Sequence, residues 1–269
     1  MQRMLPDVPR RVLQNLLKSL KAEHKAEEND RIKNNRVHIK VLAQGAILAQ
    51  DSTHVGNAKG RKAFAEVTKD AATLEAWASG DGKPITGKAM LKHLEGLKKS
   101  AQLPLVLATD NGSAYKEKEV RAWLEAHEVI QLFSRPHTPT DNARAERGIG
   151  EGKALAGLGS GVMLQSGLQG VQALQQAMQA LNKHLPRTSK GGLTAAQLKQ
   201  QLPHWQASVQ RHKFYQAACN AIQAVQGESK RAVRRETREA IFRTLELFGL
   251  ILRTRGEQKV CYIKPDNIS

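Results

Sequence analysis

Apolar residues in the middle of the chain occur in short runs that alternate with amphipathic segments. The runs at 103–109 and 129–133 are short and mostly apolar, which is typical of buried strands. Between residues 86 and 99, apolar side chains recur three or four positions apart and predict a helix with one apolar face. The same patterns predict further strands at 46–50, 62–68 and 74–79, and further helices at 116–127 and 164–185. Helices that alternate with strands in this way predict an α/β fold.

The two ends of the chain show helical patterns. Near the N-terminus, five apolar residues recur at helical spacing: Val12, Leu13, Leu16, Leu17 and Leu20. Near the C-terminus, residues 228–249 begin with a basic stretch and continue with an apolar one, which predicts a second terminal helix. Residues 251–255 and 259–263 follow it on either side of Gly256 and predict a short β-hairpin.

A carboxylate lies at the end of the predicted strand at 103–109. Asp110 comes directly after the apolar run, and Asn111-Gly112 then marks a turn. Open α/β sheets bind their ligands at the carboxyl ends of strands. Asp110 is therefore a candidate site residue.

The helix after the last predicted strand places polar groups on one face. Pro136 and Pro139 predict a loop, and we expect the helix to begin near Thr140 or Asp141, which are both good N-cap residues. Within this helix Asn142, Glu146 and Lys153 share a face, since residues seven apart differ by about 20°. Carboxylates gathered beside Asp110 would suit hard divalent cations, which support phosphoryl transfer.

The segments TDNGSAY and RPHTPTDNARAER, with 35 residues between Asp110 and Glu146, resemble the retroviral-integrase-type catalytic core of bacterial insertion-sequence transposases. The resemblance is specific from about residue 46 to residue 153. It implies a ribonuclease-H-like fold, in which a mixed five-stranded sheet is flanked by helices. It also implies an Asp, Asp, Glu triad that binds two Mg²⁺ ions, with Mn²⁺ as a substitute.

Within this resemblance, Asp110 matches the second acidic position and Glu146 the third. Asp51 fits the first, at the end or in the centre of the first strand; Asp70 and Asp81 are the alternatives, both in predicted turns. Lys153 matches a basic position that contacts DNA in the family. We therefore expect Asp51, Asp110 and Glu146 to be both the catalytic residues and the metal ligands.

Charge indicates a polyanionic partner. The chain has 42 Lys and Arg against 25 Asp and Glu, with a pI near 10.1, which favours nucleic acid over membrane. No run of 18 apolar residues is present, and two cysteines are too few for a disulfide framework, so we expect a cytoplasmic, nucleoid-associated protein and no membrane partner.

The basic excess lies at the ends and predicts three regions. Residues 1–45 hold 10 basic and 5 acidic residues, residues 46–185 hold 17 and 14, and residues 186–269 hold 15 and 6. We expect a basic helical arm, which is either part of a helix-turn-helix or a solvated linker, then a catalytic core. The last region predicts a helix-plus-hairpin DNA-binding module, or else a solvated helix docked on the core. The expected DNA contacts are Asn142, Arg144, Arg147, Lys153, Arg231, Arg234 and Arg235.

The expected activity is that of a polynucleotidyl transferase that cleaves DNA and joins strands in transposition. Its partners would be the element ends, target DNA and further copies of the chain in a synaptic complex. Two alternatives remain: a nuclease without strand transfer, and an inactive transposase-derived DNA-binding protein. Gly148, Gly150 and Gly152 favour the second alternative, because helical glycines each cost on the order of 1 kcal/mol, so the helix would be frayed.

Overall fold

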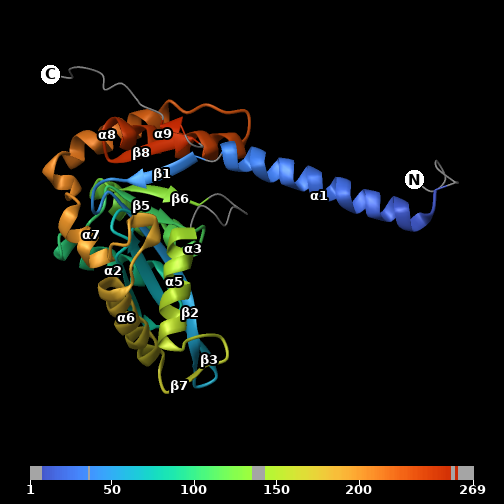
Figure 1. Ribbon diagram of the computed structural model, residues 1–269. Helices are drawn as coiled ribbons and strands as arrows, with labels where there is room; N and C mark the ends of the chain where they lie inside the picture. The colour runs from blue at the N-terminus through green and yellow to red at the C-terminus, as the bar shows by residue number, and fades with distance from the viewer. Residues whose placement is uncertain (1–7, 36, 135–142, 256–257, 260–269) are drawn as a thin grey trace. The chain divides into compact units, whose positions relative to one another are not determined.

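The computed structural model describes residues 8–35, 37–134, 143–255 and 258–259 (Figure 1). The chain forms two compact units, one of residues 41–251 and one of residues 1–40 with 252–269. All the candidate carboxylates belong to the larger unit. The three regions predicted at 1–45, 46–185 and 186–269 stay a prediction.

The larger unit is built on one mixed sheet. Its strands are β2 (Ile47–Ala58), β3 (Arg61–Asp70), β4 (Ala76–Gly82), β5 (Val106–Thr109), β6 (Ile130–Phe133) and the short β7 (Met163–Leu164). The order is β4-β3-β2-β5-β6, and β7 pairs with the far end of β2. The meander from β2 to β4 is antiparallel, whereas β2, β5 and β6 are parallel. The five-stranded mixed sheet predicted from the sequence is therefore present, with β7 as an addition.

Helices pack on both faces of this sheet. Those on the sheet are α2 (Gly87–Lys99), α3 (Ser113–Lys116), α4 (Lys118–Ala126), α5 (Ala143–Ala156) and α6 (Gly167–His184). The helices α7 (Ala195–Gln201), α8 (Arg211–Gln223) and α9 (Lys230–Leu247) follow them in the chain. One apolar cluster joins α5 and α6 to β2, β3 and β4, and a second joins α2, α3 and α4 to β2 and β5. Figure 1 shows α5 and α6 side by side along the sheet.

Local chemistry accounts for the helix predicted at 86–99. The Thr86 side chain accepts a hydrogen bond from the Ala89 N–H and caps the first turn. Met90, Leu94 and Leu97 are buried on the face that their spacing predicts. Burying three large apolar side chains in this way contributes several kcal/mol, on the order of 1.5–3 kcal/mol each.

Several predicted boundaries are wrong. The strand predicted at 46–50 continues to Ala58, so Asp51 lies inside it and not at its end. The strand predicted at 103–109 begins only at Val106. The helix predicted at 116–127 is α4, which begins at Lys118 and ends at Ala126. The short helix α3 before it was not predicted, and Glu117, with φ −57° and ψ 141°, separates the two. The predicted start at Thr140 or Asp141 lies outside the described residues.

The smaller unit contains α1 (Arg10–Asn35) and a three-stranded sheet of β1 (Val37–Val41), β8 (Ile251–Arg255) and β9 (Gln258–Lys259), in the order β1-β8-β9. The predicted helical arm and the first strand of the predicted hairpin are thus present. Strand β1 was not predicted. A search of the described residues finds no helix long and apolar enough to cross a membrane.

Candidate active site

Asp51 lies in β2, and Asp110 directly follows the end of the neighbouring strand β5. Gln50 of β2 pairs in register with Thr109 of β5, and each of these residues directly precedes one of the aspartates. Both aspartates are partly buried. Strands β2 and β5 are parallel, so the two carboxylates are presented in the same direction along the sheet.

The backbone holds both carboxylates. The Ser52 N–H donates to Asp51 Oδ1 at 2.9 Å, and the Gly112 N–H donates to Asp110 Oδ1 at 2.8 Å. The Asn111 side chain donates through Nδ2 to the Ser134 carbonyl at 2.7 Å, which ties the turn to the end of β6. The Asp-Asn-Gly turn is therefore fixed to two strands.

Glu146 lies in the first turn of α5, and its side chain is exposed. Helix α5 packs on β2, β3 and α6. The pKa of Asp51 is raised to about 7. Burial is the main cause, and the negative charges of Asp110, Glu146 and Glu66 raise the pKa further, whereas the hydrogen bond from the Ser52 N–H lowers it. The fold thus brings the charges of the three predicted carboxylates within range of one another.

Helix α5 continues through the three glycines that predicted fraying. Gly148 and Gly152 are buried, and a Cβ at Gly148 would lie 3.0 Å from Lys69 Nζ. A Cβ at Gly152 would lie 3.0 Å from Leu174 Cδ1, whereas Gly150 is exposed with open space around it. Two of the three glycines therefore allow close packing of α5.

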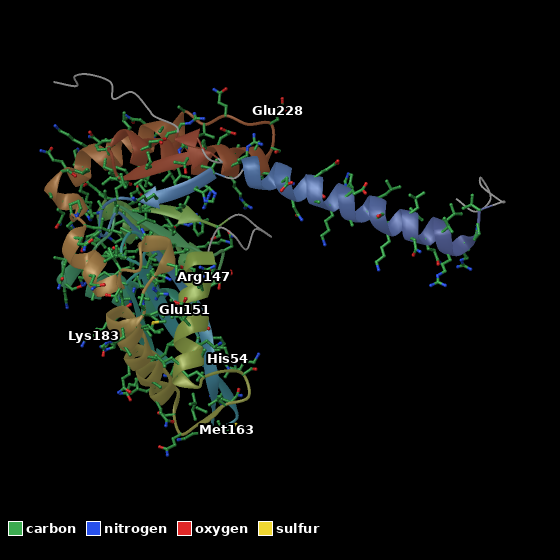
Figure 2. All side chains as sticks on the ribbon, in the orientation of Figure 1. His54, Arg147, Glu151, Met163, Lys183 and Glu228 are labelled. Carbon is green, nitrogen blue, oxygen red and sulfur yellow. The ribbon has the colours of Figure 1, made fainter. Side chains whose placement is uncertain are left out.

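The predicted DNA contacts are placed on two helices. Arg147 is exposed and Lys153 is partly buried on α5, and Lys153 lies seven residues after Glu146 in the same continuous helix. Figure 2 shows Arg147 and Glu151 on α5, and the carboxylate of Glu151 pairs with the buried Arg187. Asn142 and the side chain of Arg144 lie outside what the structure describes. The other three are exposed on α9: Arg231, Arg234 and Arg235.

The alternatives for the first acidic position have other surroundings. Asp70 is buried and accepts backbone hydrogen bonds from Gly45, Ala72 and Thr73 at 2.6–3.0 Å, so it caps the turn after β3. Asp81 is exposed and accepts from the Lys83 N–H. Neither contributes to the charge around Asp51.

A group of cations that was not predicted lies near the Asp110 turn. Lys116 Nζ and the Arg121 guanidinium lie 5.9 Å and 6.0 Å from the centroid of the Phe133 ring. From α9, Arg238 Nη1 donates to the Phe133 carbonyl at 3.5 Å. These residues are far apart in sequence, and Lys116 and Arg121 alone have the pattern of a solvated helix face.

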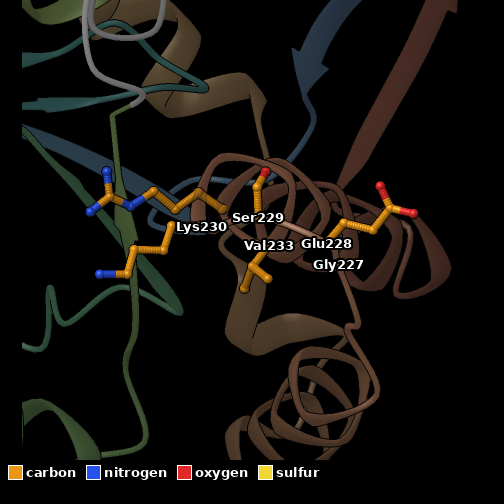
Figure 3. Close-up of a pocket in the computed structure, with 6 residues that line it drawn as sticks. Gly227, Glu228, Ser229, Lys230 and Val233 are labelled. Carbon is orange, nitrogen blue, oxygen red and sulfur yellow. The ribbon is translucent and has the colours of Figure 1, made fainter.

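A shallow pocket lies at the start of α9 (Figure 3). Its volume is about 410 Å³, and it is lined by Gly227, Glu228, Ser229, Lys230, Val233 and Arg234. Lys230 and Glu228 extend in opposite directions in the close-up. The pocket includes one predicted DNA contact and none of the three predicted catalytic carboxylates.

The donor set around Asp51 fits a divalent cation in its chemistry. Within the described ranges, no three His, Cys, Asp or Glu side chains gather closely enough to form a ready-made metal site. However, carboxylate oxygens are the ligands that Mg²⁺ prefers, and the raised pKa of Asp51 reflects burial and repulsion that a cation would relieve. The residues therefore fit such an ion if the exposed Glu146 side chain turns toward the aspartates.

Comparison with known proteins gives one match by sequence and several by fold. No protein-family model matches the chain. A Pro-Pol polyprotein of feline foamy virus is 36% identical over 92 residues, which are 33% of this chain and 8% of the polyprotein, so the chain spans a small part of that relative.

Among solved structures, a chain of the simian T-cell lymphotropic virus intasome with the PP2A regulatory subunit B56 gamma matches with a TM-score of 0.50 at 23% identity, over 61% of this chain and 57% of that one. The HTLV-2 integrase catalytic core domain in complex with magnesium gives 0.45 at 20% identity, over 59% and 99%. The mixed sheet flanked by helices is the ribonuclease-H-like fold of integrase catalytic cores, as the sequence predicted.

Proposed function

We propose that the chain is a transposase or integrase of the Asp, Asp, Glu type, which cleaves DNA and transfers strands for a bacterial mobile element. The observation that carries the proposal is the juxtaposition of Asp51 and Asp110 on adjacent parallel strands, with the charge of Glu146 reaching them from α5. The resemblance carried by TDNGSAY and RPHTPTDNARAER, with 35 residues between Asp110 and Glu146, supports it from the sequence.

In this proposal the three carboxylates hold two Mg²⁺ ions, which Mn²⁺ can replace. Bound cations would supply Lewis acidity to the attacking and leaving oxygens of phosphoryl transfer. The chain's own residues prepare the site: Asp51 gives up its proton, the Gly112 N–H orients Asp110, and α5 delivers Glu146. No side chain acts as a nucleophile, since water and then a DNA 3′-hydroxyl attack.

The same proposal gives DNA two sets of contacts. Arg147 and Lys153 on α5 would bind phosphates beside Glu146, together with Asn142 and Arg144. The cations around Phe133 extend this surface toward the basic residues of α9, Arg231, Arg234 and Arg235. Both element ends and target DNA would bind here, in a synaptic complex of several copies of the chain at the nucleoid.

The test is removal of each carboxylate. Asp51→Asn, Asp110→Asn and Glu146→Gln should each reduce Mg²⁺-dependent cleavage and joining by roughly a thousandfold, because each removes a charged group that stabilises the transition state. DNA affinity, measured by fluorescence anisotropy, should change little. Asp70→Asn and Asp81→Asn are the matched controls, since they remove carboxylates at the alternative positions.

The assay also separates the alternatives. Cleavage without joining of pre-cut 3′ ends would favour a ribonuclease-H-like nuclease. Absence of any Mg²⁺-dependent nicking would favour an inactive DNA-binding protein. If Asp51→Asn keeps its activity while Asp70→Asn or Asp81→Asn loses it, Asp51 is not the first acidic residue.

Asp51 should make both stability and cation binding depend on pH. Its pKa is about 7 in the fold, against an ordinary value of 3.8, so between these values the folded state binds more protons than the unfolded state. The free protein should therefore lose stability as pH rises from about 4 through 7. Asp51→Asn should remove the contribution of Asp51 to that slope in urea unfolding, while Glu66 and Asp70, whose pKa values burial also raises, keep theirs. Because a proton competes with the cation, Mg²⁺ affinity should fall about fivefold between pH 7 and pH 6 by calorimetry. An affinity that is flat over this range would contradict the assignment.

A further inference from the structure

A fourth carboxylate, Glu66 of β3, lies behind the two aspartates. It is 7% exposed and pairs in register with Ser52, the residue after Asp51. The Tyr115 hydroxyl donates to Glu66 Oε2 at 2.9 Å. The other oxygen, Oε1, is fully buried and has no hydrogen-bond partner among the described residues. The Ser52 and Gln50 side chains also lower the pKa of Glu66 by hydrogen bonding, so Tyr115 is one of three polar side chains that act on this carboxylate. Burying a carboxylate is nevertheless costly to the fold.

Glu66 lies on the face of the sheet opposite to Asp51. Successive side chains of a strand alternate between faces, so Ser52 and its partner Glu66 share one face while Asp51 and its partner Val67 share the other. The clusters agree: Tyr115 packs with the α2–α4 side, and Val67 packs with the α5–α6 side. Glu66 therefore contacts the site from the α2–α4 face of the sheet, whereas the Asp51 carboxylate lies on the α5–α6 face and would bind the cation there.

Tyr115 connects this carboxylate to the Asp110 turn. It is 1% exposed and lies in α3, five residues after Asp110. Its backbone carbonyl accepts from Gln131 Nε2 of β6 at 2.8 Å. Gly112 lies between Asp110 and Tyr115, and a Cβ there would lie 3.0 Å from Asp110 Oδ1 and 3.2 Å from the Tyr115 ring. The ring, the turn and the carboxylate are thus packed without space to shift independently.

We propose that Glu66 and Tyr115 are a positioning pair that locks the Asp110 turn onto β3, so that Asp51 and Asp110 meet a divalent cation in a fixed arrangement. The inference rests on the proposed function, because it takes the aspartates as cation ligands. Hydrogen bonds to a carboxylate are stronger than those between neutral groups, so the Tyr115 hydroxyl is held firmly. Burial raises the pKa of Glu66 and the Asp110 charge adds to this, which places the two carboxylates within electrostatic reach.

The experiment measures Mn²⁺ binding by the full chain with electron paramagnetic resonance, which does not depend on activity. Tyr115→Phe removes only the hydroxyl and should weaken Mn²⁺ binding about tenfold or more, as expected when a support of metal ligands is lost. Tyr215→Phe, on α8, is the matched control and should leave the affinity unchanged. Mn²⁺ affinity within twofold of wild type in Tyr115→Phe would overturn the proposal.

A double variant separates positioning from mere stability. Glu66→Leu with Tyr115→Phe removes both members of the pair, so neither the Tyr115 hydroxyl nor the Glu66 carboxylate is left without the other, and stability should largely return relative to the single variants. If the pair positions Asp110, Mn²⁺ binding stays weak in this stable double variant. If binding returns with stability, the pair is structural only and the proposal is wrong. This variant also decides the matter if Tyr115→Phe alone does not fold.

Failure of the inference and failure of the proposed function give different results. The proposed function is overturned, and the inference with it, if wild-type protein binds no Mn²⁺ or if the Asp110→Asn variant binds Mn²⁺ as tightly as wild type does. Wild-type binding that Asp110→Asn abolishes, with Tyr115→Phe and the double variant unaffected, overturns the inference alone.

Discussion

The two faces of the central sheet are packed with side chains of different size. On the α5–α6 face the strands contribute mainly small residues: Val55, Ala63, Ala65, Val67, Ala76 and Ala78. On the α2–α4 face the strands contribute the larger Leu48 and Leu107. The helices add large side chains to both faces: Ile149, Val171, Leu174 and Met178 to the first, and Met90, Leu94, Leu97, Tyr115 and Leu124 to the second. Helix α5 packs on the first face with Gly148 and Gly152. Helix α2 packs on the second face with Met90 and Leu94.

This difference gives the two faces different roles at the candidate site. Small side chains and glycines let the backbone of α5 come close to β2 and β3, which is what brings Glu146 toward Asp51. Large side chains on the other face bury more apolar area and hold the Asp110 turn through Tyr115. We therefore expect substitutions on the first face to affect the site beyond their effect on stability. On the second face we expect apolar substitutions away from Glu66 and Tyr115 to affect mainly stability.

The largest expected effect is on the α2–α4 face. Leu94 is fully buried, and Leu94→Ala should lower the free energy of unfolding by about 2–5 kcal/mol, because it removes apolar contacts and leaves a cavity. Urea unfolding measures this loss. At a temperature where the variant stays folded, its Mn²⁺ affinity should match wild type. A variant that loses cation binding while still folded would show that the two faces are not separable in this way.

A smaller loss of stability with a larger effect on the site is expected on the α5–α6 face. Gly152→Leu places a side chain where a Cβ alone would lie 3.0 Å from Leu174 and 3.2 Å from Met178. Overpacking should cost about 1–3 kcal/mol and push α5 away from the sheet, so strand transfer and Mn²⁺ affinity should both fall. Gly150→Leu is the matched control, since it has the same gain in helix propensity in open space. Equal behaviour of the two variants would contradict close packing at Gly152.

Local patterns predicted most of the sheet and α2, because these elements follow from side chains near one another in sequence. The apolar spacing of Met90 and Leu94, with Thr86 as the cap, needs no tertiary information. The second half of β2 was missed because polar residues such as Thr53 and Asn57 interrupt its pattern. It is a strand because it pairs with β3 along its whole length. Strand β1 and helix α8 were missed in the same way, without an apolar pattern strong enough to predict them.

At the candidate site, the resemblance to integrase-type cores indicated Asp51, Asp110 and Glu146, but nothing in the sequence indicated Glu66. In the sequence, Glu66 is a polar position in an alternating strand, and its partner Tyr115 is 49 residues away. For the glycines of α5, the residues were noticed in the sequence but their role was not, because that role depends on tertiary contacts. Propensity alone predicted a weak helix at Gly148 and Gly152, and the reason for these residues is the close contact with Lys69, Leu174 and Met178.

The smallest expected effect is at the glycine that makes no contact. Gly150 is helical and exposed, and a Cβ there would meet nothing within 4 Å. Gly150→Ala should therefore stabilise the protein by about 1 kcal/mol, because alanine loses less backbone entropy in a helix than glycine does. Thermal and urea unfolding measure the gain, and strand transfer measured beside it should be unchanged. Reduced strand transfer in a stabilised Gly150→Ala protein would mean that DNA lies against this turn of α5, where an added Cβ would clash with it. Lys153→Ala would then test the same surface, because Lys153 lies about one turn further along α5. The substitution should weaken DNA binding there.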